Sequence, residues 1–162
     1  MNGRPLGITI IAWLYLAAGT VFLATQGPIL LEPGQIRDAL ATVGSTVPLY
    51  IFQTGLISIV MVFCGIGMLM GRSWSWWGGI FLEANTIVFS IYSLIVIGDS
   101  FPLVYHIKQA APLLIAVIVF VYLFGEKAMS YLQIKRPVLT PVLGGVFAVN
   151  LGAVLFLAAL RV

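Results

Sequence analysis

Residues 71–89, "GRSWSWWGGIFLEANTIVF", place an arginine and three tryptophans directly before a long apolar segment that contains one acid, Glu83. Arginine and tryptophan are typical of the boundary between a membrane and water. Glu83 follows Trp76 by seven residues, so in a helix it lies ~10 Å further along the axis, at ~1.5 Å per residue. The stretch therefore predicts a helix that enters an apolar layer and places an acid deep inside it.

The composition of the whole chain agrees with such a layer. Hydrophobic residues make up 61% of the 162 positions and charged residues only 8%, whereas a soluble domain has roughly 25% charged residues. A chain of this length cannot hide so much apolar surface in water. The basic residues are spread along the chain without a block, so we expect no nucleic-acid partner. The natural partner is a lipid bilayer.

Five apolar runs approach or reach the roughly 20 residues that a membrane-spanning helix needs. They are continuous rather than alternating, which favours helices over barrel strands. We therefore predict an all-α fold, a polytopic transmembrane helix bundle with five spans. The runs are Leu6 to Gln26, Leu49 to Met70, Trp74 to Ile97, Gln109 to Phe124 and Val138 to Leu160.

The runs divide into two parts. Residues 1–137 form a predicted four-helix transmembrane unit, and residues 138–162 a C-terminal transmembrane helix. Gly27 and Pro28 predict the end of the first span, followed by an outer loop at 27–48.

Two segments between the runs have amphipathic patterns. Within the outer loop, residues 36–43 have apolar positions at helical spacing, which fits either a short surface helix or a simple structured loop. Residues 125–136 are predicted to continue the fourth helix beyond the membrane surface. Pro112 is expected in the first turn of that fourth helix, where a proline is tolerated.

The distribution of basic residues predicts the orientation, because short cytoplasmic loops are enriched in lysine and arginine. Five spans would place five basic residues on the side of the N-terminus and three on the other side. We therefore expect a membrane protein with its N-terminus in the cytoplasm and its C-terminus outside. If the fifth run does not span the membrane, the C-terminus lies in the cytoplasm instead. The first group is Arg4, Arg72, Lys127, Lys135 and Arg136, and the second is Arg37, Lys108 and Arg161.

A polar stripe follows one side of the third run. At 100° per residue its members stay within a narrow arc, and the opposite side is apolar, with Phe81, Leu82 and Val88. Carboxyl and hydroxyl groups need partners inside a membrane, so the stripe should face other helices or a cavity. Polar candidates on the other runs include Gln53, Tyr15 and Asn150. The stripe consists of Gly79, Glu83, Thr86, Ser90 and Ser93.

Glu83 has two interpretations. An ionised acid at this depth costs at least ~2.5–3.5 kcal/mol, so it must be protonated, paired with a cation, or hydrated. It is either a proton or cation site on a pathway, or a protonated hydrogen-bond donor that holds helices together. The proposed intramembrane polar site comprises Glu83, Thr86, Ser90, Gln53 and Asn150.

Small residues recur at spacings that allow helices to approach closely. The fifth run has Gly144, Ala148 and Gly152 at intervals of four, and the second has Gly67 and Gly71. These residues serve either packing inside this chain or packing against another subunit. The second interpretation is best motivated for the fifth run, because four helices could form a compact bundle without it.

The remaining candidates suggest anchors rather than chemistry. Arg72, Trp74, Trp76 and Trp77 form a predicted interface anchor. His106 is the only histidine and lies in a predicted outer loop. It is a weak candidate ligand for a haem or pigment, and one histidine makes no metal site alone. We therefore predict no metal and no cofactor.

Two short motifs resemble those of a loose group of small prokaryotic integral membrane proteins of unassigned function. One is the Arg4, Pro5, Leu6, Gly7 start of the first helix, and the other is the Gly71, Arg72, Trp74, Trp76 turn between the second and third helices. The resemblance covers residues 4–134. The resemblance implies a four-helix unit in a prokaryotic cytoplasmic (inner) membrane and no particular reaction. The fifth run is an addition to that pattern.

No nucleophile motif, zinc-protease motif or phosphate-binding glycine loop is present in the sequence. We therefore predict a non-enzymatic protein, a structural or accessory subunit that packs within a larger membrane complex or a homo-oligomer. The alternative is a small proton-coupled transporter or channel subunit that uses Glu83.

Overall fold

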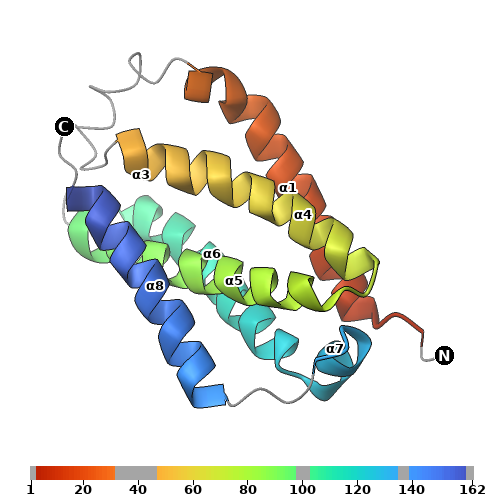
Figure 1. Ribbon diagram of the computed structural model, residues 1–162. Helices are drawn as coiled ribbons and strands as arrows, with labels where there is room; N and C mark the ends of the chain where they lie inside the picture. Colours follow the sequence, from red (N-terminus) through yellow and green to blue (C-terminus); the bar gives the residue numbers. More distant parts are fainter. Residues whose placement is uncertain (1–2, 32–46, 98–102, 135–138, 160–162) are drawn as a thin grey trace.

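The computed structural model describes residues 3–31, 47–97, 103–134 and 139–159, and within these ranges all regular structure is helical (Figure 1). The all-α prediction is thus confirmed for the described residues. Two short stretches are π-helical: η2 lies between α3 and α4, and η3 follows α5 directly. The elements are α1 (Leu6–Leu31), α3 (Val47–Ile51), η2 (Phe52–Leu56), α4 (Ile57–Leu69), α5 (Ser73–Tyr92), η3 (Ser93–Ile97), α6 (Leu103–Leu123), α7 (Glu126–Tyr131) and α8 (Leu139–Ala159).

Three helical runs are long and apolar enough to cross a membrane. They are Leu6–Gln26, Val47–Leu69 and Ser73–Ile95. In the described part of the chain two further apolar helical stretches are shorter, Ala110–Leu123 and Gly144–Phe156. The fourth and fifth spans therefore remain predictions.

Helix α5 occupies the centre of the bundle. It contacts α4, α6 and α8, while α1 packs along α4. Figure 1 shows α1 and α4 side by side, α8 crossing α5, and the short helix α7 near the start of α1. The core accordingly contains side chains from α1, α4, α5 and α6, among them Ile8, Met68, Ile80 and Leu123.

Helix α1 does not end at Gly27 and Pro28, as predicted, but continues to Leu31. A proline lacks one N–H, so it removes one backbone hydrogen bond from a helix, and the helix can continue beyond it. The predicted outer loop is shorter at its other end too, since α3 begins at Val47. The amphipathic segment 36–43 lies outside the described residues.

Helix α6 begins at Leu103, six residues before the predicted start. Pro112 therefore lies in the third turn rather than the first, and His106 belongs to a helix rather than to a loop. The helix ends at Leu123 because Gly125 adopts an extended conformation, with φ −66° and ψ 143°. The predicted continuation through residues 125–136 is wrong, because α7 starts anew after this glycine.

The turn between α4 and α5 requires glycine. Gly71 has a φ of +67°, in the left-handed region that a residue without Cβ adopts most readily. Its N–H donates to the carbonyl of Met68, and the Arg72 N–H donates to that of Gly67 at 2.9 Å. These two bonds form a Schellman motif, which ends α4 and leaves the Leu69 carbonyl for other donors.

Candidate functional site

The Glu83 carboxyl group on α5 is paired with a tyrosine on α1. The hydroxyl of Tyr15 donates a hydrogen bond to Glu83 Oε1, and both side chains are only 6% exposed. The described residues give the Glu83 carboxyl no second hydrogen bond. The bond joins α1 to α5 through two residues that are 68 positions apart in sequence.

The pair borders a groove of about 320 Å³ between α1, α4, α5 and α6. Its polar lining residues are Tyr15, Glu83 and Thr86, and the remaining walls are apolar. Leu14 on α1 and Ile115 on α6 line the groove and are more than half exposed. The groove therefore reaches the outer surface of the bundle next to these two residues.

The other polar members of the predicted stripe are either buried or hydrogen-bonded to the backbone of α5. Ser90 and Ser93 are buried. Thr86 is half-buried and donates its hydroxyl to the Leu82 carbonyl at 3.0 Å. Within the stripe, Glu83 and Thr86 are the residues that line the groove.

Gln53 lies apart from Glu83 and pairs with Asn85. The amides of Gln53 in η2 and Asn85 on α5 exchange two hydrogen bonds, of 3.0 and 3.4 Å. Asn85, which is 1% exposed, is not among the polar candidates predicted from the sequence. The signal in the sequence that could have identified Asn85 is its position, an amide two residues after Glu83 within an apolar run.

Asn85 lies on the side of α5 that the sequence pattern predicts to be apolar. At 100° per residue, Asn85 is 200° from Glu83 around the helix. Leu82 and Val88 on that side are also buried. Neighbouring helices cover α5 on several sides, because α4, α6 and α8 all contact it.

Asn150 on α8 is fully buried and incompletely paired. Its Nδ2 donates to the Val146 carbonyl in the same helix at 2.9 Å. Its Oδ1 accepts no hydrogen bond from the described residues. Asn150 does not line the groove at Glu83.

The predicted interface anchor separates into two parts. Trp74 and Trp77 are about half exposed, and Arg72 is exposed. Trp76 is completely buried, and its indole Nε1 donates to the Leu123 carbonyl at 2.7 Å. That carbonyl accepts no α-helical hydrogen bond because α6 ends there, so Trp76 links α5 to the end of α6 instead of anchoring the surface.

The first motif of the resemblance contacts the end of α4, two residues before the second motif begins. The Arg4 guanidinium donates to the Leu69 carbonyl at 2.7 Å and to the Tyr131 hydroxyl at 3.2 Å. Tyr131 donates to the same carbonyl. A cation at the C-terminus of α4 is also favoured by the helix dipole. Arg4 therefore joins the start of α1, the end of α4 and α7.

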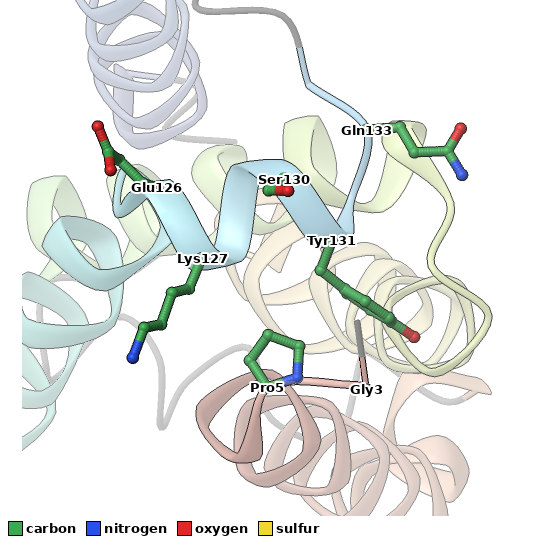
Figure 2. Close-up of a pocket in the computed structure, with 7 residues that line it drawn as sticks. All are labelled: Gly3, Pro5, Glu126, Lys127, Ser130, Tyr131 and Gln133. Carbon is green, nitrogen blue, oxygen red and sulfur yellow. The ribbon is translucent and has the colours of Figure 1, made fainter. Parts of the chain in front are cut away.

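Beside this contact lies a cleft of about 680 Å³ between the start of α1 and α7 (Figure 2). Gly3 and Pro5 form one side, and Lys127, Ser130 and Tyr131 form part of the other. In Figure 2 the Glu126 and Lys127 side chains point in different directions rather than toward a common point. The cleft thus lacks a convergent set of charged groups.

The predicted small residues have different surroundings. A Cβ on Gly67 would lie 2.6 Å from the Trp74 ring, so this glycine permits α4 and α5 to meet. Cβ atoms on Gly144 and Gly152 would have no neighbour within 4 Å, and Ala148 between them is exposed. The α8 face formed by Gly144, Ala148 and Gly152 is uncovered by the described chain.

The described residues include no group of three or more His, Cys, Asp or Glu side chains that could hold a metal ion. His106 lies in α6, and its side chain is outside the described set. No family model, curated protein or solved structure matches this chain.

Proposed function

We propose that the protein is a non-enzymatic integral membrane subunit that associates with another membrane protein, or with a second copy of itself, through the α8 face. The observation that supports this is the uncovered face formed by Gly144, Ala148 and Gly152. Inside a membrane, helices associate by close van der Waals contact, which small residues at intervals of four permit. The other interpretation of these small residues is packing within this chain. No described part of the chain lies against Gly144 or Gly152.

The proposed location is a prokaryotic inner membrane, with a cytoplasmic N-terminus and an outside C-terminus. Three apolar helical runs have the length that a span requires. Arg4 and Tyr131 meet at the end of α4, which brings Arg4, Arg72 and Lys127 to one end of the bundle. Basic residues gathered at one end favour the cytoplasmic side.

The test is the assembly state after mild extraction from native membranes. Gly152→Leu fills the uncovered face, and Val21→Leu is the control, since Val21 is an exposed residue on another helix, α1. We expect wild type and Val21→Leu to migrate as the same assembly, and Gly152→Leu to migrate as a smaller species with unchanged helicity. A wild-type protein that is monomeric, without a co-purifying chain, would contradict the proposal.

The alternative function, a proton-coupled transporter or channel subunit, is favoured by one observation. The Tyr15–Glu83 pair borders a groove that reaches the outer surface of the bundle. Glu83→Gln keeps the size of the side chain and removes its titratable group. Under the alternative, proteoliposomes with this variant lose proton uptake while the bundle stays folded, and under the subunit proposal the variant assembles as wild type does.

A further inference from the structure

We infer that the groove between α1 and α6 binds a small lipophilic amine, with the ammonium group at Glu83 and the apolar body against the groove walls. The inference requires a membrane location but is independent of the proposed association through α8. Three features of the groove support it: its position, its lining and its charge.

The position of the groove suits a molecule that arrives from the lipid phase. Leu14 and Ile115 are both more than half exposed and both line it, so its mouth lies on the apolar outer surface of the bundle. Glu83 follows the half-exposed Trp74 by nine residues, about 14 Å along the helix at ~1.5 Å per residue. A ligand that reaches Glu83 must therefore be soluble in hydrocarbon over most of its length.

The lining of the groove selects an apolar ligand with one polar end. A volume of about 320 Å³ is at the lower limit of the range for small-molecule sites, roughly 300–1,000 Å³. Ile57, Met61 and Val119 contribute apolar walls, while Glu83, Tyr15 and Thr86 supply the polar groups. Thr86 already donates its hydroxyl within α5, so Glu83 is the strongest acceptor for a ligand.

The charge of the groove favours an amine over other polar ends. The described lining residues include one acid and no lysine, arginine or histidine. The Glu83 carboxyl group has no cationic side chain among these lining residues. The ammonium group of a ligand would be such a cationic partner and would form a charge-assisted hydrogen bond with the carboxyl group. A phosphate-bearing lipid headgroup would bring an anion to a site without basic residues, so we expect single-chain amines rather than aminophospholipids.

The test uses the full chain in phosphatidylcholine nanodiscs and photo-labelling with a diazirine-bearing dodecylamine. The matched probes are the corresponding dodecanol and a diazirine-bearing phosphatidylethanolamine. Adducts are located by mass spectrometry after digestion. We expect the amine to label the groove residues Leu14, Met61 and Ile115 about tenfold more than the alcohol does, as for one charge-assisted hydrogen bond.

Three variants make the outcome specific. Glu83→Gln should reduce amine labelling of the groove to the level of the alcohol, and Glu126→Gln, an acid outside the groove, should leave it unchanged. Ile115→Trp narrows the mouth at an exposed position and should reduce labelling by both single-chain probes while Glu83 is intact. Equal labelling by amine and alcohol in the wild type would overturn the inference, as would preferential labelling by the phospholipid.

Discussion

The glycines of the central bundle, formed by α1, α4, α5 and α6, and those of α8 have opposite surroundings. A Cβ on Gly65 of α4 would lie 2.7 Å from Leu16 Cγ and 2.8 Å from the Ala12 carbonyl oxygen. One on Gly19 of α1 would lie 2.7 Å from the Ser58 carbonyl oxygen. Gly144 and Gly152 of α8 have no such neighbour. The same residue type thus permits helix contact inside the chain in one region and leaves a face uncovered in the other.

The difference extends to polar groups. In the central bundle the Leu69 and Leu123 carbonyls, left over at helix ends, accept hydrogen bonds from Arg4 and Trp76. On α8, Asn150 Oδ1 accepts none from the described residues. Buried polar groups in folded proteins are nearly always paired. Side chains of the same chain therefore satisfy the ends of α4 and α6, whereas α8 contains a buried amide oxygen without a partner among the described residues.

The largest expected effect tests the packing of Trp76 in the core of the bundle. Trp76→Ala removes a fully buried ring and leaves the Leu123 carbonyl without its donor. We expect the free energy of unfolding in detergent to fall by about 3–5 kcal/mol. The control is Trp13→Ala, because Trp13 on α1 is 60% exposed. Equal losses for the two variants would contradict the assignment of Trp76 to the core.

A pair of glycine substitutions tests the comparison directly. Gly65→Ala forces a methyl group against the Ala12 backbone, and we expect unfolding to become easier by about 1–3 kcal/mol. Gly152→Ala meets open space, and we expect the isolated chain to gain up to about 1 kcal/mol from the better helix propensity of alanine. Thermal unfolding of both proteins in the same detergent measures the difference. A loss of stability in Gly152→Ala as large as that in Gly65→Ala would remove the distinction between the two regions.

A smaller effect separates the two buried asparagines. Asn85→Leu leaves the Gln53 amide without its partner, and we expect a loss of about 1–3 kcal/mol in unfolding free energy. Asn150→Leu removes an amide whose Oδ1 has no described partner, so we expect little change in the isolated chain. The measurement is again detergent unfolding, and a large loss for Asn150→Leu alone would show that α8 is already fully paired.

Part of this architecture could be predicted from the sequence and part could not. The helical class follows from the length of the apolar runs, because a bilayer or a core permits few alternatives to a helix. The burial of Glu83 follows from its place among small and polar residues at helical spacing. Tyr15 is one of several polar candidates for the partner of Glu83. The choice among them does not follow from the sequence, because Tyr15 reaches Glu83 through the register between α1 and α5, which apolar periodicity does not specify.

Two corrections have a similar cause. Trp76 is predicted to lie at the membrane surface because its sequence neighbours Trp74 and Trp77 are typical surface anchors. In the structure α6 ends before Gly125, and the free carbonyl of Leu123 accepts a hydrogen bond from the Trp76 indole. The pairing of Asn85 does not follow from the sequence pattern, because the side of α5 opposite the polar stripe is predicted to be apolar. A central helix is covered on several sides, and its neighbours cannot be identified from its own sequence.

The central claim is that the Gly144, Ala148 and Gly152 face of α8 is covered by a partner in the membrane. The most direct measurement replaces Ala148 with a diazirine-bearing amino acid and irradiates native membranes before any extraction. The account predicts a protein cross-link, to a second copy or to another chain, that Gly152→Leu abolishes. Labelling of lipid alone from position 148, with no protein adduct, would contradict it.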